Sequence, residues 1–315
     1  MLNLSQSEVH NGLRCIYELR VSYYQMTPQI FWTQVTTILL NCIGSVMAVT
    51  GNAVLLLALR CSANLCDRPF FFALQWLCVA NIGIGLFAQI AFVVRRSMEL
   101  DSGNVSCTSM ILYQNVAAAT SGIAFFTAAF LVLERWAAIC HPIKHRTRMT
   151  KRKIAITLAF TWVLVFVVTI LRVFGLDQRI LFLVLALLIA FIITASFVSY
   201  CMILKEVGEG NNRINAFPND ADNVAVNVDR RKEYKIARNT LLKLLLLVLH
   251  YTPLMISMLM YNAGGKLEVI AYSIGLPVSE TIFMLTSSVD PFLFYFKNRQ
   301  VREAIITFLR GKCRM

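Results

Sequence analysis

Residues 121–142 read Ser121-Gly-Ile-Ala-Phe-Phe-Thr-Ala-Ala-Phe-Leu-Val-Leu-Glu134-Arg135-Trp136-Ala-Ala-Ile-Cys-His141-Pro142, an apolar run closed by an adjacent acid and base. The complete apolar stretch, 108–139, is longer than the roughly 20 residues that a helix needs to cross the hydrocarbon core of a bilayer. The pattern therefore predicts a transmembrane helix with Glu134 and Arg135 at one end.

Six further stretches are long and apolar enough for the same assignment: 31–59, 69–94, 153–175, 179–204, 236–261 and 267–296. The chain is 57% hydrophobic and only 15% charged over 315 residues, whereas soluble domains have roughly 45–50% apolar and about 25% charged residues. We expect an all-α membrane protein, a seven-transmembrane helix bundle over 30–296. A tail (1–29) precedes the bundle, and a short amphipathic helix and a tail (297–315) follow it.

Basic residues indicate the orientation of the seven spans. With the N-terminus outside, the inner loops and C-terminal tail hold 20 Lys and Arg residues and the outer segments hold 7. Because cytoplasmic loops carry the excess of Lys and Arg, we expect an extracellular N-terminus and a cytoplasmic C-terminus in the plasma membrane. Two glycosylation sequons, at Asn3 and Asn104, fall on the outer side. The net charge of +13 thus indicates a basic inner surface that faces anionic lipid, with no nucleic-acid partner expected.

Polar side chains inside a bilayer are costly, so each needs a reason. The candidates are Asn52, Asn81, Glu134 with Arg135, His250, Glu280 and Asp290. Taken singly, each is equally well explained as a helix-packing hydrogen bond. Their order along the chain is more informative.

The chain resembles the rhodopsin-like (class A) family of G-protein-coupled receptors in one motif after another. Gly51-Asn52 is similar to the family's first-span pair, and Glu134-Arg135-Trp136 to its Asp-Arg-Tyr. Asp290-Pro291-Phe292-Leu293-Phe294 resembles Asn-Pro-x-x-Tyr. Further matching positions are Asn81, Trp162, Tyr200 and Pro253.

The resemblance implies a heterotrimeric G protein as partner and a latch between spans three and six. Arg135 would pair with Glu233, although Arg135 pairing with Glu134 and a solvated Glu233 remain open. Trp136 and Tyr200 belong to the same coupling region. The implied hinge is Pro253, with Pro291 weakening span seven; Tyr251 stands where the family usually has Trp, and Phe294 where it has Tyr.

Asn81 and Asp290 reverse the family's usual Asp and Asn. We expect them to form a polar core with Asn52. Because the span-three serine of the family is Ala124 here, a hydrated network is expected in preference to a strong sodium site, and no metal or other cofactor is expected.

Glu280 is an outer-half carboxylate and a candidate ligand anchor, with pairing to Lys266, Arg95 or Arg96 as the alternative. By resemblance, Met284, Ala117, Gln114 and His250 also belong to the ligand pocket. Ala117 replaces the Asp of amine receptors, and Met284 the Lys of opsins. The ligand stays open among small molecules, lipids and peptides; a weaker resemblance points to the melanocortin, cannabinoid and lysophospholipid branch.

Most of the family ties span three to the second outer loop by a disulfide, but that loop here contains no cysteine. By comparison with this pattern we expect Cys15 and Cys107 to pair, and Cys313 to be palmitoylated. The remaining cysteines are expected to be reduced: Cys42, Cys61, Cys66, Cys78, Cys140 and Cys201.

Two other functions are possible readings of the sequence. A receptor-like protein without signalling fits the altered motifs, and a transporter or channel is disfavoured because inverted repeats and paired broken helices are missing. No nucleophile–base set or phosphate-binding loop indicates an enzyme.

Overall fold

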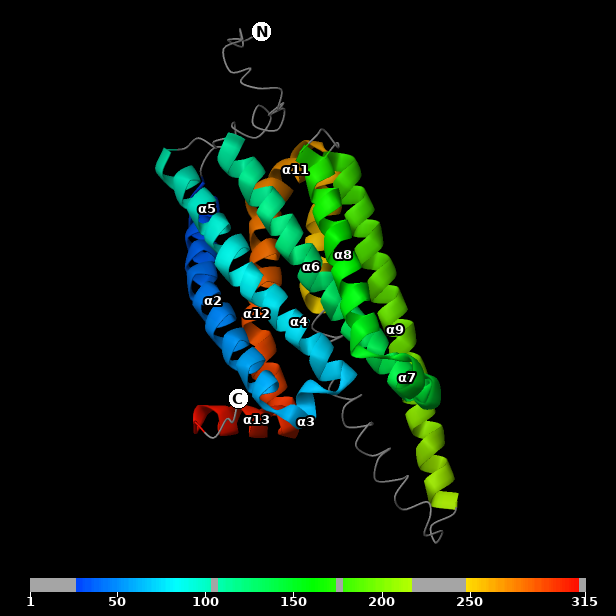
Figure 1. Ribbon diagram of the computed structural model, residues 1–315. Helices are drawn as coiled ribbons and strands as arrows, with labels where there is room; N and C mark the ends of the chain where they lie inside the picture. Colours follow the sequence, from blue (N-terminus) through cyan, green and yellow to red (C-terminus); the bar gives the residue numbers. More distant parts are fainter. Residues whose placement is uncertain (1–26, 103–106, 174–177, 217–247, 312–315) are drawn as a thin grey trace.

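The computed structural model describes residues 27–102, 107–173, 178–216 and 248–311. The regular structure in these ranges is helical, which confirms the expected all-α class. The long helices run side by side, and the short helix α13 lies across one end of the bundle (Figure 1). The first half contains α2 (Pro28–Cys61), α3 (Ala63–Cys66), α4 (Pro69–Gly83), the π-helix η1 (Ile84–Gln89), α5 (Ile90–Ser102), α6 (Cys107–Cys140) and α7 (Pro142–Arg148).

The second half begins with α8 (Lys151–Val173) and α9 (Gln178–Ala216). A helical segment over 248–263 follows, and then α11 (Gly265–Ile270), the π-helix η2 (Ala271–Gly275), α12 (Leu276–Lys297) and α13 (Arg299–Leu309). Gly264 and Gly265 have φ of 75° and 62°, a left-handed backbone that glycine adopts without steric cost. They make the turn that leads into α11.

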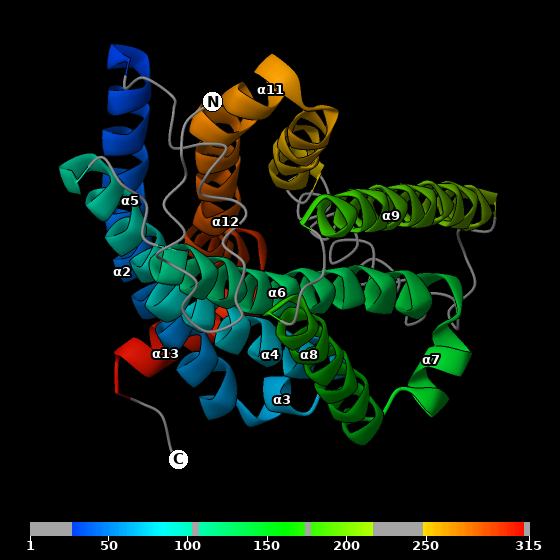
Figure 2. The ribbon, with the colours of Figure 1, turned by 90° about the horizontal axis from the view of Figure 1, so that it is seen from above.

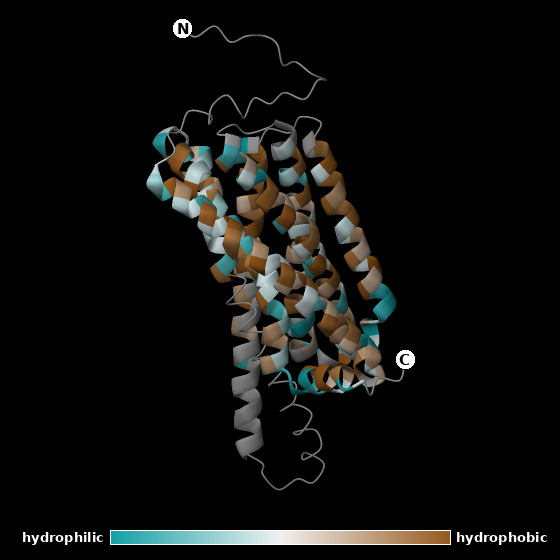
Figure 3. Ribbon diagram, turned by 90° about the vertical axis from the view of Figure 1, so that its left-hand side faces the viewer, coloured by the Kyte–Doolittle hydropathy of each residue, from teal (hydrophilic) through white to brown (hydrophobic). Residues whose placement is uncertain are grey.

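Five helical stretches of the described chain are long and apolar enough to cross a membrane: Pro28–Cys61, Pro69–Asp101, Ile111–Ala138, Lys151–Leu171 and Gly265–Lys297. They correspond to five of the seven expected spans. The expected fifth span lies in α9, whose apolar part, Arg179–Ala195, is shorter. The first part of the expected sixth span, 236–247, lies outside the described residues. Hydrophobic residue types predominate along the long helices (Figure 3), and many large apolar side chains are exposed on them, among them Val46, Phe160 and Phe191, as lipid contact requires.

Helix boundaries follow local sequence signals. Thr27 caps α2 by accepting a hydrogen bond from the Ile30 amide, and Asn298 caps α13 by accepting from the amides of Gln300 and Val301. These side chains satisfy amides that have no partner inside the helix. The expected loop after residue 204 is helical instead: α9 continues to Ala216, and the next proline is Pro218.

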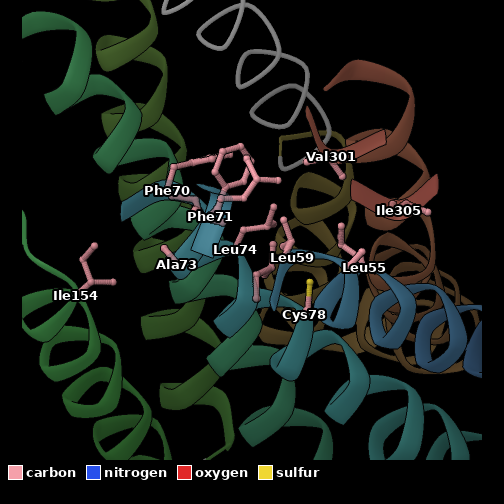
Figure 4. Packing of buried hydrophobic residues seen from close by; sticks show 14 of the residues in the cluster. Leu55, Leu59, Phe70, Phe71, Ala73, Leu74, Cys78, Ile154, Val301 and Ile305 are labelled. Carbon is pink, nitrogen blue, oxygen red and sulfur yellow. The ribbon is translucent and has the colours of Figure 1, made fainter. Parts of the chain in front are cut away.

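The buried apolar residues of the described ranges form three clusters. α6 lies near the middle of the bundle, with α4 and α8 on one side and α9 on the other (Figure 2). At the end that carries α13, apolar residues of α2, α4 and α13 pack together, among them Leu59, Phe70, Leu74, Val301 and Ile305 (Figure 4). We call this end the α13 end and the opposite one the α11 end.

The first and last long helices are joined by hydrogen bonds. The Asn41 side chain of α2 donates to the Thr281 hydroxyl of α12 over 2.9 Å. The Ser288 hydroxyl donates to the Gly44 carbonyl over 2.8 Å. α2 and α12 therefore hold each other through buried polar contacts, which are strong in a low-dielectric interior.

An ion pair joins α3 to α8 at the surface of the α13 end. The Lys151 ammonium donates a hydrogen bond to the carboxylate of Asp67, the residue that follows α3. Both side chains are exposed, so the pair positions the two elements more than it stabilises them.

Candidate functional site

A buried ionic cluster lies at the α13 end of α6. Arg135 donates two hydrogen bonds to the carboxylate of Glu134, from Nε to Oε2 over 2.6 Å and from Nη2 to Oε1 over 2.7 Å. His145 of α7 places Nε2 3.0 Å from the same Oε1. Glu134 and Arg135 are 1% and 6% exposed. A buried charge is tolerated only when it is paired in this way, so the cluster fixes α6 against α7.

Phe70 of α4 connects this cluster to α12. The Arg135 guanidinium lies 4.3 Å from the centre of the Phe70 ring, and the Phe294 ring lies 6.4 Å from it. A cation over an aromatic face is attracted by the ring quadrupole. Nothing in the sequence marks Phe70 for this role, because it is one of several apolar residues in its span. His145 was missed as well, in a basic segment expected to be a loop.

Of the three other residues of the expected coupling region, the structure describes the side chain of Trp136. The Trp136 ring lies 5.7 Å from the His141 ring, and the buried Trp136 Nε1 has no hydrogen-bond partner among the described residues. Tyr200 lies on α9, where its side chain is outside the description, and Glu233 lies outside the described residues altogether.

The structure brings Asn52, Asn81 and Asp290 together. Asn81 Nδ2 donates to Asp290 Oδ2 over 3.0 Å and lies 3.2 Å from Asn52 Oδ1. Asn52 Nδ2 donates to the Ser287 carbonyl over 2.8 Å. All three side chains are buried. The network links α2, α4 and α12, since one amide bridges a second amide and a carboxylate.

A small cavity adjoins this network. Its lining includes Asn81, Ala124, Tyr251, Ser287 and Asp290. The Tyr251 ring forms its aromatic side, with its centre 4.4 Å from that of Phe125 and 4.9 Å from that of Phe283.

The two prolines expected to weaken helices are also placed. Pro253 follows Tyr251 by two residues within the helical segment 248–263. Pro291 lies inside α12, where its ring approaches Gly51 of α2 so closely that a Cβ at Gly51 would lie 3.0 Å from Pro291 Cγ. Gly51 therefore allows α2 to pass the proline ring.

Toward the α11 end, Glu280 is half-buried and accepts a hydrogen bond of 2.7 Å from the Tyr113 hydroxyl. Met284 is 1% exposed in an apolar cluster against which Ala117 packs. Gln114 and His250 are half-buried, on α6 and on the segment 248–263. Tyr113, the partner of Glu280, was not selected from the sequence.

Most of the expected disulfide and modification sites lie outside the residues that the structure describes. Asn3, Asn104, Cys15 and Cys313 lie outside the described residues, and Cys107 begins α6 with its side chain outside the description. Cys61, the last residue of α2, is disulfide-bonded, which corrects its expected reduced state; no sequence signal marked it for pairing. Five cysteines form no disulfide, as expected: Cys42, Cys66, Cys78, Cys140 and Cys201.

Comparison with known proteins agrees with this geometry. Residues 51–181 match the model of the family described as "7 transmembrane receptor (rhodopsin family)". The chain is 22% identical to adenosine receptor A3 of Ovis aries over 90% of this chain and 92% of that receptor. It is 28% identical to human adenosine receptor A2b over 40% of this chain and 37% of that receptor. It is 29% identical to human olfactory receptor 2T4 over 34% of this chain and 30% of that receptor. The chain thus spans only about a third of the length of these two human relatives.

Apolar helices around a buried polar network define a multi-pass α-helical membrane protein. The matches add a likeness: residues 51–181 are similar to the rhodopsin-like family of seven-transmembrane receptors, and most of the chain is similar to an adenosine receptor. Its relatives here are adenosine and olfactory receptors, and the expected melanocortin, cannabinoid and lysophospholipid branch is not confirmed.

Proposed function

We propose that the protein is a plasma-membrane receptor that binds an extracellular ligand and activates a heterotrimeric G protein. Seven spans over 30–296, with the α13 end in the cytoplasm and the tail 1–29 outside, are part of this proposal. The excess of basic residues in the segments at the α13 end supports the orientation. On the outer side, glycans at Asn3 and Asn104 and a Cys15–Cys107 disulfide are proposed, and on the inner side palmitoylation of Cys313.

The Glu134–Arg135 pair is the observation that carries the proposal. At the proposed inner end of the bundle, the Arg135 guanidinium is bound to the carboxylate of Glu134. If this pair separated, Arg135 would present five N–H donors to a partner. The carboxylate of Glu233 is proposed as a second restraint on Arg135. Opening would involve rotation of the segment around Pro253, because proline removes a backbone hydrogen bond and weakens the helix there.

A population shift between a closed and an open bundle would couple the two sides. The contact from Arg135 through Phe70 to Phe294 supports such coupling, since it links the cluster to α12. α12 also carries Asp290 and, further toward the α11 end, Glu280. A ligand that moves α12 would therefore alter the packing around Arg135.

The test is G-protein activation in cells without added ligand. We expect Glu134→Gln and Glu233→Ala to raise basal activity, because each removes a restraint on Arg135, and Arg135→Ala to abolish it. Arg148→Ala, an exposed arginine on α7, is the matched control and should behave like the parent. Equal activity of all variants across the G-protein classes, at equal surface expression, would favour a receptor-like protein that does not signal.

A further inference from the structure

Three charged side chains of α5 are buried at the α11 end of the bundle. Arg95, Arg96 and Glu99 are 4%, 1% and 3% exposed. Among these three α5 side chains, two guanidinium groups and one carboxylate leave an excess of one positive charge. The carboxylate of Glu280 on α12 is only half-buried, and it is held by the Tyr113 hydroxyl. Burial of an unbalanced charge is costly, which makes this cluster unlike an ordinary packing contact.

Each carboxylate oxygen of Glu99 has an arginine beside it. Arg96 Nη1 donates to Glu99 Oε2 over 2.6 Å, and Arg95 Nη2 lies 3.5 Å from Oε1. The same Arg95 Nη2 donates to the Tyr272 hydroxyl of η2 over 2.9 Å. The Arg95 guanidinium also lies 5.1 Å from the centre of the Tyr113 ring. The acceptors that the described helices supply here are therefore already occupied.

Donors remain in surplus. The Nε atoms of Arg95 and of Arg96 are buried, and neither has a hydrogen-bond partner in the described part of the chain. Buried polar groups in native proteins are nearly always paired. Since the surplus consists of N–H donors and the charge is positive, the complementary group is a single-charged anion with two acceptor oxygens.

Glu280 does not reverse this conclusion. Its carboxylate accepts the hydroxyl of Tyr113 over 2.7 Å, and the same tyrosine ring lies against Arg95. A ligand cation at Glu280 would therefore have to approach a guanidinium. Position 117, one turn further along α6, is alanine and adds no negative charge.

We propose that Arg95 and Arg96 bind the carboxylate group of the ligand. This inference rests on the proposed receptor function, because it places the ligand's acidic group in the outer half of the bundle. The ligand carboxylate lies beside Glu99 and accepts hydrogen bonds from the arginine N–H groups that lack an acceptor. Guanidinium–carboxylate hydrogen bonds fix its orientation. Tyr272 and Tyr113 hold Arg95 in position from η2 and α6.

The probes are three matched ten-carbon compounds, decanoate, decylamine and decanol, and their four-carbon equivalents butyrate, butylamine and butanol. Thermal stability of the purified full-length receptor in detergent is measured against the concentration of each compound. We expect a saturable rise in Tm with at least one acid and none with the amine or alcohol of the same length. Stabilisation by an amine, or by no acid in the set, would overturn the proposal.

Two variants with opposite expected effects separate recognition from structure. Arg95→Gln should raise the acid concentration that gives half of the maximal rise in Tm at least tenfold, because it removes the cation. Glu99→Gln should lower this half-maximal concentration, because it removes the carboxylate that competes for the arginines. Arg179→Gln is the control: Arg179 lies at the same end and pairs with Glu268 at 3.1 Å. An acid response that is unchanged in both Arg95→Gln and Glu99→Gln contradicts the site.

The outcomes also separate this site from the proposed function. Stabilisation by an acid without any G-protein response would support the carboxylate site and contradict the proposed signalling function. Altered basal signalling in the Glu134→Gln variant, together with no stabilisation by any acid, would support the signalling function and contradict the carboxylate site.

Discussion

Gln89 shows how much a single side chain can cost this bundle. It is fully buried at the end of η1, and neither atom of its amide has a partner among the described residues. The amide lies against Gly44 of α2, where an added Cβ would be 2.7 Å from Gln89 Nε2. Leaving such a group unpaired costs about 1–3 kcal/mol.

Replacing Gln89 with Met should therefore stabilise the protein by about 1 kcal/mol or more, since the side chain keeps its length and loses its polar atoms. The measurement is Tm in detergent. Asn52→Leu is the comparison, because it leaves Asn81 and the Ser287 carbonyl with one partner fewer and should lower Tm. A lower Tm for Gln89→Met would show that the amide has a partner in solution.

Phe70 gives a second test at this scale. Phe70→Leu removes the ring over Arg135, an interaction worth roughly 0.5–2 kcal/mol, so basal G-protein activation should rise by about two- to thirtyfold. Phe71→Leu is the matched control, since Phe71 is a buried neighbour in the same apolar cluster. Equal basal activity in the two variants would remove Phe70 from the proposed latch.

The sequence predicted the helices and several polar positions but few of their partners. Asn52, Asn81 and Asp290 were selected as polar residues in apolar spans, and the structure places them in one network. Phe70, Tyr113 and His145 do not stand out in the sequence, because aromatic residues abound in spans and a histidine in a basic segment carries no periodic signal. Contacts between spans depend on helix rotation, which hydropathy does not specify.

At the scale of elements, η1 is what hydropathy could not predict. A π-helix contains an extra residue per turn and changes which side chains face inward beyond it. The residues beyond η1 include Arg95, Arg96 and Glu99, all of which are buried. The Ser45 hydroxyl of α2 donates to the Gly85 carbonyl inside η1 over 2.8 Å, so α2 helps to hold the irregular turn.

Two glycines of one span test this packing. A Cβ at Gly85 would lie 2.9 Å from Val49 Cγ2 and 3.2 Å from the Ser45 carbonyl oxygen, whereas at Gly83 the nearest atom is 3.9 Å away. Gly85→Ala should therefore destabilise by about 1–3 kcal/mol through overpacking. Gly83→Ala should be neutral or stabilise by up to about 1 kcal/mol, since alanine favours the helix. Thermal unfolding of both variants decides, and similar Tm values would argue against a close α2–η1 contact.

At the scale of the whole molecule, the helices differ in how far they are covered by protein. Only 17% of the most apolar part of α8 is buried inside the bundle, against 50% in the stretches Pro69–Asp101 and Gly265–Lys297. α8 therefore lies at the lipid-facing margin. Phe160, near its middle, is 69% exposed.

Phe160→Arg should impair membrane insertion, because an arginine at the middle of a span costs roughly 2.5–3.5 kcal/mol. The measurement is the fraction of protein that resists alkaline extraction from membranes. Ile143→Arg is the control: Ile143 is 81% exposed on α7, outside the expected spans. Equal extraction of the two variants would contradict the assignment of α8 as a membrane span.

The hydrogen bonds between α2 and α12 also bear on how the chain is made. Their partners are separated by 235 to 244 residues, so the ribosome releases α2 long before its partner helix exists. During that interval Asn41 and Asn52 have the hydrogen bonds to Thr37 and Ala48 within α2 but lack their partners on α12. A truncated product without α12 would carry these amides permanently, and cellular quality control that detects polar groups in lipid would find it. The hydrogen bonds between α2 and α12 can therefore form only after nearly the whole chain has been synthesised.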